Sequence, residues 1–133
     1  LYYFSRNRKK KWEERRIKYL PLEELLEKTE IISLHLPKNT KLLKKKEFEV
    51  FGKGKILIST SLGIPFEETA FQEWLEKEGT FGIFDGDSRA GLSGRSLEKE
   101  NLISYRKSAG WSEETRKRLS EKVLKNLKNF VES

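Results

Sequence analysis

The sequence predicts an α/β fold, a parallel sheet with helices on both faces. Two observations support this prediction. Short apolar runs alternate with helix-like segments through the whole 133-residue chain, as in folds that cross from strand to helix to strand. The central runs, residues 30–36, 55–60 and 80–85, are apolar almost throughout, which is typical of parallel strands covered on both sides.

The first part of the chain predicts two strands and two helices before the central sheet. Residues 1–5 are aromatic and predict a short buried strand. A charged helix should begin near Lys10, with Trp12 as its main apolar contact, and residues 17–20 should form a short edge strand. Residues 21–26 predict a short helix, and Pro21 suits its first turn. The strand over residues 30–36 should stop at Pro37.

The second part continues the alternation. Residues 44–51 predict a helix with Phe48 and Phe51 inward, and residues 66–77 predict an amphipathic helix that Gly79 ends. Residues 86–94 are rich in Gly, Ser and charge and predict a loop, and residues 101–104 predict a last strand. Ser112 should cap a final helix. Its apolar stripe would comprise Leu119, Val123, Leu124, Leu127, Phe130 and Val131. We expect one domain over residues 1–133.

Composition excludes several classes of function. The chain has no Cys and one His, which excludes a disulfide framework and argues against a zinc site. No apolar run is long enough to cross a membrane and no signal-peptide pattern is visible, so we expect a cytoplasmic protein without a membrane partner. The 28 basic and 21 acidic residues give a net charge of +7. Because no nucleic-acid-binding motif accompanies this charge, a nucleic-acid partner is the least favoured prediction.

Four polar segments follow four of the predicted strands. They are residues 5–8, 36–37, 60–63 and 85–86. In an open parallel sheet, ligands bind outside the carboxyl ends of the strands. The sequence therefore predicts a shared ligand site on one edge of one sheet.

Several runs resemble the D-2-hydroxyacid dehydrogenase family, in order and nearly in spacing. LEELLEKTEIISLHLP at residues 22–37 is similar to the helix and strand before the family's cofactor loop, and GKILISTS at residues 54–61 is similar to its next strand. Residues 67–71 resemble the start of the following helix, and Phe84-Asp85 resembles a strand end. Asn101-Leu102-Ile103, followed by Ala109-Gly110, resembles the last strand and the loop after it.

The resemblance implies a Rossmann-like NAD(P)-binding domain of an oxidoreductase. Such enzymes transfer hydride between NAD(P)H and a 2-oxoacid or 2-hydroxyacid, and family members dimerise through this domain, so we expect a homodimer. The family's first strand and its Gly-rich turn have no counterpart in this sequence. We therefore expect a sheet that is incomplete at its N-terminus. The implied cofactor-binding residues are Ser5, Arg6, Arg8, Leu36, Pro37, Ser61 and Asp85.

The segment after the first strand favours NADP over NAD. NAD-specific members of the family carry an acidic residue where this chain has Ser5, followed by Arg6 and Arg8. That arrangement is similar to glyoxylate reductases of the family. A hydroxyl and two guanidinium groups suit a 2′-phosphate, whereas a carboxylate would repel it.

The family's catalytic residues are replaced. The substrate-binding arginine falls at Leu62, the acidic residue at Ser88 with Asp87 one position early, and the histidine at Lys107. We therefore expect impaired catalysis, although an active enzyme that uses Lys107 also fits the sequence. His35 lies away from the catalytic position and is interpreted as structural. Two further functions compete with an oxidoreductase: a non-catalytic NAD(P)-sensing or protein-interaction module, as in corepressor relatives of the family, and a basic nucleic-acid binder.

Overall fold

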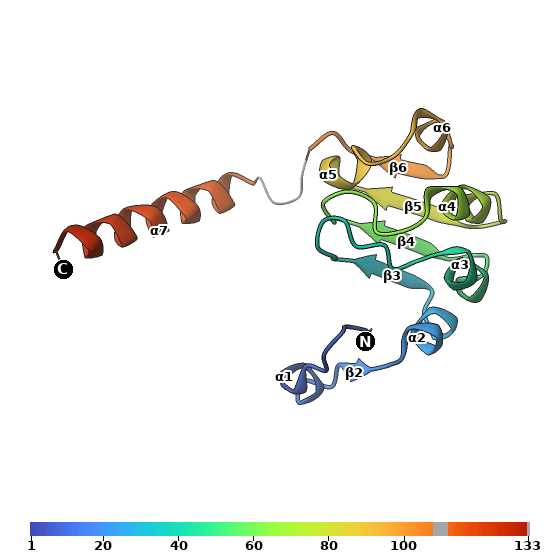
Figure 1. Ribbon diagram of the computed structural model, residues 1–133, viewed down its shortest axis with the longest axis horizontal. Helices are drawn as coiled ribbons and strands as arrows, with labels where there is room; N and C mark the ends of the chain where they lie inside the picture. The colour runs from blue at the N-terminus through green and yellow to red at the C-terminus, as the bar shows by residue number, and fades with distance from the viewer. Residues whose placement is uncertain (108–111, 133) are drawn as a thin grey trace.

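A four-stranded parallel sheet organises the molecule, and the computed structural model describes residues 1–107 and 112–132 of it (Figure 1). Ala109 and Gly110 of the resemblance lie outside the described residues. The strand order is β3 (Ile31–Leu34), β4 (Ile56–Ser59), β5 (Phe81–Phe84) and β6 (Leu102–Ser104). In the register, Ile31 pairs with Ile56 and Ile56 with Phe81. The predicted parallel α/β sheet is confirmed.

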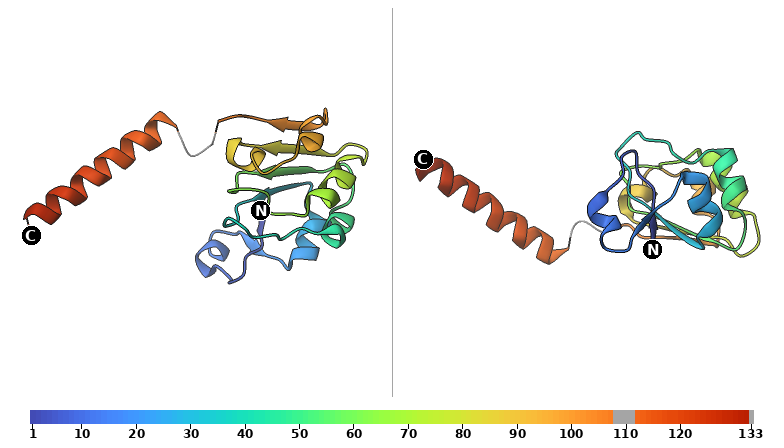
Figure 2. Two further views of the ribbon diagram at one scale, coloured as in Figure 1. Left: turned by 45° about the horizontal axis from the view of Figure 1, so that its top comes forward. Right: turned by 90° about the horizontal axis from the view of Figure 1, so that it is seen from below.

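Three helices cover one face of this sheet, α2 (Leu22–Lys28), α3 (Lys45–Phe51) and α4 (Glu68–Leu75) (Figure 2). The core between them and the sheet combines aliphatic side chains with a cluster of buried aromatic rings, which are Phe48, Phe51, Phe66, Phe71, Trp74 and Phe84. Phe48 and Phe51 point inward as predicted. Burial of each ring contributes about 1.5–3 kcal/mol to the free energy of unfolding, whereas a surface ion pair contributes about 0–1 kcal/mol. The aromatic rings therefore stabilise the fold more than the surface ion pairs do.

The opposite face of the sheet is open within the described residues. Burial alternates along β3 and β5, and Ile31, Phe81 and Ile103 are exposed although they lie in strands. Successive strand residues point to opposite faces. The strand order advances in one direction, so right-handed crossovers place α3 and α4 on the same side. The continuous apolar runs predicted that both faces of the sheet would be covered, whereas the described residues cover one face.

A separate two-stranded sheet precedes the main one. It pairs β1 (Tyr2–Tyr3) with β2 (Lys18–Tyr19) in parallel, with α1 (Lys10–Glu13) between them in sequence. Tyr3 is buried against Trp12 and Tyr19, with ring centroids 5.1 Å and 5.4 Å away. Among the described residues no strand joins this pair to β3. The expected break in the sheet is therefore present.

The predicted loop over residues 86–94 is wrong in part, because α5 (Gly86–Arg89) and the start of α6 (Gly94–Leu97) lie there. Asp85 caps α5, its Oδ1 accepting the Ser88 N–H at 3.0 Å. A side chain at Gly86 would place Cβ 2.8 Å from the Arg106 carbonyl oxygen, so glycine is needed for this close approach. Composition indicated a loop, but capping and packing against β6 order the segment.

The last helix, α7 (Glu113–Glu132), projects away from both sheets (Figure 1). Ser112 caps it as predicted, since its Oγ accepts the Thr115 N–H at 3.2 Å. The predicted apolar stripe is exposed along its length, from Leu119 at 57% to Val131 at 81%. Within the described residues no helix combines the length and the hydropathy required to cross a bilayer.

Glu68 joins α4 to α6, and replacing it with Gln should weaken the fold in a pH-dependent way. Its Oε1 accepts the Ser93 N–H at 2.7 Å and the Ser96 hydroxyl at 2.6 Å. Burial raises the pKa of Glu68, but the hydrogen bonds from Ser96 and Ser93 outweigh it and bring the pKa below 4.5. A carboxyl group whose pKa is lowered on folding stabilises the folded state at pH values above its pKa in the unfolded chain. This contribution is lost as the pH falls through the pKa that the group has in the folded state.

Glu68→Gln should therefore lower the free energy of unfolding by about 1–2 kcal/mol at pH 7, and the difference from the wild type should shrink below pH 4.5. Urea denaturation of the full chain from pH 7 to pH 3 measures both. Glu49→Gln, on the exposed face of α3, is the matched control and should cost little. A difference that stays constant with pH would contradict the assignment.

Candidate functional site

Buried serine hydroxyls tie together the segments that follow β3, β4 and β5. Ser61 Oγ donates to the Leu34 carbonyl at 3.1 Å and accepts the Leu36 N–H at 3.0 Å. Ser88 Oγ donates to the Ser61 carbonyl at 2.8 Å and lies 2.9 Å from Ser59 Oγ. Of the predicted site residues, Leu36, Ser61 and Asp85 are therefore brought to one edge of the main sheet. Pro37 follows there in an exposed turn closed by the Thr40 N–H.

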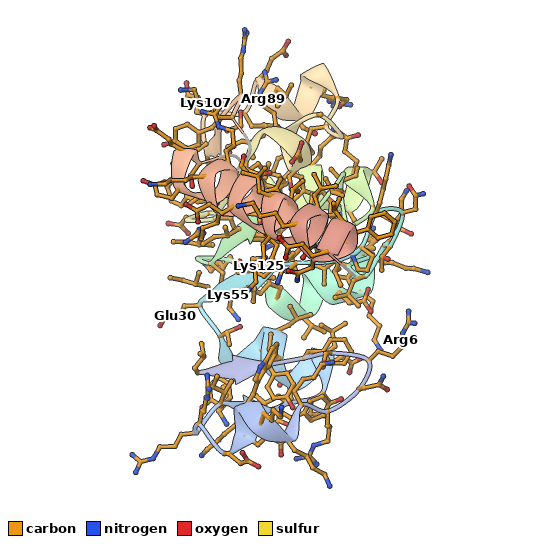
Figure 3. All side chains as sticks on the ribbon, turned by 90° about the vertical axis from the view of Figure 1, so that its left-hand side faces the viewer. Arg6, Glu30, Lys55, Arg89, Lys107 and Lys125 are labelled. Atoms are coloured by element: carbon orange, nitrogen blue, oxygen red, sulfur yellow. The ribbon has the colours of Figure 1, made fainter. Side chains whose placement is uncertain are left out.

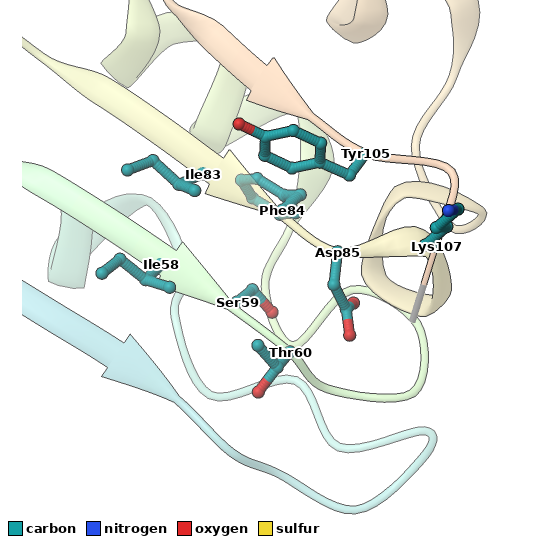
Figure 4. Close-up of a pocket in the computed structure, with 8 residues that line it drawn as sticks. All are labelled: Ile58, Ser59, Thr60, Ile83, Phe84, Asp85, Tyr105 and Lys107. Carbon is teal, nitrogen blue, oxygen red and sulfur yellow. The ribbon is translucent and has the colours of Figure 1, made fainter. Parts of the chain in front are cut away.

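A pocket of about 340 Å³ opens at this edge (Figure 4). Its lining residues come from β4, β5 and the segment after β6, and they are Ile58, Ser59, Thr60, Ile83, Phe84, Asp85, Tyr105 and Lys107. Ile58 and Ile83 lie side by side on the open face, with the Tyr105 ring next to them. The Thr60 hydroxyl and the Asp85 carboxylate lie at the strand ends. The pocket thus combines an apolar wall with a few polar groups, as small-molecule sites commonly do.

His35 is held between two hydroxyls beside this pocket. Its Nε2 lies 2.9 Å from Ser33 Oγ and its Nδ1 lies 3.0 Å from Thr60 Oγ1. The two contacts fix the ring and orient Thr60, which lines the pocket. This geometry accords with the structural interpretation of His35. Thr60 belongs to the predicted ligand segment 60–63, although it was not among the implied cofactor-binding residues. Sequence reasoning missed Tyr105, because only the strand register brings it to the pocket.

The remaining predicted residues lie in a different part of the molecule. Ser5, Arg6 and Arg8 follow β1, which belongs to the two-stranded sheet, so the prediction of a single sheet edge is wrong for them. Viewed toward the strand ends in Figure 3, Arg6 lies in the lower part of the molecule and Lys107 in the upper part. Ser5 Oγ donates to the Asn7 carbonyl at 2.6 Å and shapes the turn. The predicted cofactor residues therefore form two groups.

Glu13 is a residue of this second group that sequence reasoning missed. Arg8 donates to it twice, from Nε to Oε1 at 3.0 Å and from the terminal nitrogen to Oε2 at 2.6 Å. The Tyr3 hydroxyl also donates to Oε1, at 2.9 Å. The hydrogen bonds from Arg8 and from Tyr3 lower the pKa of the Glu13 carboxyl, and Glu13 in turn raises the pKa of Arg8. An acidic residue inside the basic run 6–16 was the available signal.

The positions that correspond to the family's catalytic residues have three different environments. Leu62 is 57% exposed, Ser88 is fully buried, and Lys107 is exposed at the pocket. Ser88 is occupied with holding the strand ends, so it cannot reach a ligand. Asp87, half-buried on α5, does not line the pocket. In residues 1–107 and 112–132, no three His, Cys, Asp or Glu side chains cluster as metal ligands would.

Known proteins match this chain over nearly its full length. Residues 1–85 match the family described as D-isomer specific 2-hydroxyacid dehydrogenase, NAD binding domain. A glyoxylate reductase from Korarchaeum cryptofilum is 29% identical over 98% of the chain, which spans 41% of that relative.

Solved structures agree on the fold. A D-isomer specific 2-hydroxyacid dehydrogenase from Lactobacillus delbrueckii, in its NAD-complexed form, superposes over 99% of the chain and 46% of its own length, with a TM-score of 0.82 and 14% identity. A glyoxylate reductase from Paecilomyes thermophila covers 99% of the chain and 42% of its own length, with a TM-score of 0.79 and 23% identity.

Ser88→Ala should destabilise the strand-end segments. Removing this hydroxyl leaves the Ser61 carbonyl without its buried donor, which costs about 1–3 kcal/mol of unfolding free energy. Ser120→Ala is the control, because Ser120 is exposed on α7 and bonds only within the helix. Urea denaturation of both variants compares them. Equal stability of Ser88→Ala and wild type would refute the role of the hydroxyl.

Proposed function

Because this chain belongs to the D-isomer specific 2-hydroxyacid dehydrogenase family, we propose that it forms the cofactor-binding part of an oxidoreductase that transfers hydride between NAD(P)H and a 2-oxoacid. The observation that carries the proposal is the pocket at the carboxyl ends of β4 and β5. The chain spans 41% of the Korarchaeum relative, so the activity of the whole protein is part of the proposal.

The pocket fits the nicotinamide end of the cofactor. Ile58, Ile83 and the Tyr105 ring offer an apolar wall to a flat ring, and Thr60 and Asp85 offer oxygen atoms to a carboxamide. The Asp85 carboxylate is already oriented by the Ser88 N–H. When bound, the reduced cofactor supplies the hydride. The contribution of these residues is to position the ring at the open edge of the sheet.

The segment after β1 fits the adenosine end, and it favours NADPH. Arg6 is exposed in the turn that Ser5 shapes, so its guanidinium is available to a phosphate. Arg8 lies in the same turn, fixed by Glu13. Guanidinium groups bind phosphate oxygens through paired N–H donors, which supports binding of a 2′-phosphate.

Catalysis by this chain is impaired in our proposal. Leu62 cannot pair with a substrate carboxylate, Ser88 is buried, and Lys107 replaces a histidine. A lysine ammonium is a poor replacement for an imidazole as both proton donor and proton acceptor at neutral pH. The dimerisation of family members through this domain supports a homodimer as the assembly.

The second candidate function is a non-catalytic NAD(P)-sensing or protein-interaction module. The observation that favours it is the apolar surface of α7, where Leu124 is 58% exposed and Leu127 is 55% exposed. Surfaces of this kind commonly mark contacts with other proteins. This candidate predicts that the cofactor alters the affinity for a partner without turnover.

Arg6→Ala should weaken NADPH binding selectively. Loss of a charge-assisted hydrogen bond costs about tenfold in affinity for NADPH, while the affinity for NADH should change by less than about twofold. Titration of the full chain, followed by fluorescence of the reduced nicotinamide, measures both. Arg15→Ala, at an exposed arginine that follows α1, is the control and should leave both affinities unchanged. If the wild type binds neither NADPH nor NADH, the proposed function is refuted.

Turnover of 2-oxoacids should stay at background in the wild type and rise when two family residues are restored. Leu62→Arg supplies a guanidinium that can bind the substrate carboxylate, and Lys107→His supplies an imidazole that titrates near neutral pH. Together they should raise the turnover rate about 10²-fold. Both positions are exposed, so the new side chains fit without repacking. Consumption of NADPH with glyoxylate gives the rate. A wild-type activity that Lys107→Ala abolishes would instead show an active enzyme that uses Lys107.

A further inference from the structure

A carboxylate occupies the group of residues that would bind the cofactor phosphate. Glu13 lies against Arg8 in a two-point ion pair, with a shortest separation of 2.6 Å. Its position is fixed from the other side by Tyr3, whose hydroxyl donates to Glu13 Oε1 at 2.9 Å and accepts the Lys9 N–H at 2.6 Å. Because Tyr3 is 7% exposed and belongs to β1, the carboxylate is anchored to the strand and cannot easily swing away.

The pair has two opposing consequences for Arg8. Its guanidinium is held in one place, bonded to Glu13 and packed over the Tyr19 ring at 5.2 Å from the ring centroid. The ion pair with Glu13 uses only some of the five N–H donors of Arg8, so the others remain available to a ligand. Its positive charge, however, is offset by an adjacent negative one, which weakens the attraction to a doubly charged phosphate.

From this geometry we propose that Glu13 limits the discrimination between NADPH and NADH, so that the protein binds both cofactors. This inference rests on the proposed function. Arg6 supplies the uncompensated charge for a 2′-phosphate, and Arg8 supplies oriented donors at reduced charge. Glu13 is thus a positioning residue that sets specificity through Arg8, and it takes no part in hydride transfer.

The test compares the ratio of NADPH to NADH affinity among variants of the full chain at fixed ionic strength. Glu13→Gln removes the negative charge and should raise the ratio at least about threefold, with NADH affinity nearly unchanged. The matched control is Glu14→Gln, which removes the same charge from the neighbouring exposed residue and should leave the ratio unchanged. An unchanged or lower ratio in Glu13→Gln, or an equal rise in Glu14→Gln, overturns the inference.

A second pair of variants keeps the test decisive if Glu13→Gln disturbs folding and weakens NADH as well. Arg8→Gln leaves the Glu13 carboxylate facing the phosphate, so it should lower the ratio more than Arg6→Ala does. A smaller effect than that of Arg6→Ala overturns the inference. If the wild type binds neither cofactor, the proposed function and this inference fail together; if it binds both and the ratio does not respond, only the inference fails.

Discussion

The site depends on the need of buried hydroxyl groups for partners. Ser59, Ser61 and Ser88 lie at the ends of β4 and β5, all nearly or fully buried, and each finds a hydrogen bond there. No buried side-chain nitrogen or oxygen in the described residues is left without a partner. Losing such a partner costs about 1–3 kcal/mol, which is enough to hold the strand-end segments in one arrangement. The pocket exists because these segments are held.

The aromatic rings of the core hold the helices against the main sheet. The Trp74 ring stacks against both Phe51 and Phe71, and its indole N–H donates to the Gly52 carbonyl at 2.6 Å. Lys55 adds a polar attachment, since its Nζ donates to the Leu26 and Glu27 carbonyls at the end of α2. Partial burial of the Lys55 ammonium lowers its pKa. Packing and polar contacts thus fix α2, α3 and β4 together.

The two groups of cofactor residues differ in how they are supported. The pocket rests on the main sheet and its aromatic core, whereas Arg6 and Arg8 rest on a two-residue strand pair and one buried tyrosine. A nicotinamide dinucleotide that reached both would link the two sheets through the ligand. In that event, cofactor binding would stabilise the arrangement of the sheets as well as occupy a site.

Local patterns in the amino-acid sequence were enough to establish the parallel α/β architecture, the inward faces of α3 and α4, and the family, because periodicity and motif order belong to the chain itself. They also placed Leu36, Ser61 and Asp85 after strands, and parallel strands bring such positions to one edge. The three-dimensional arrangement was needed to show that Ser88 is buried, that Thr60 and Tyr105 line the pocket, and that Glu13 pairs with Arg8. Those contacts depend on strand register, capping and burial between segments far apart in sequence, which no local pattern encodes.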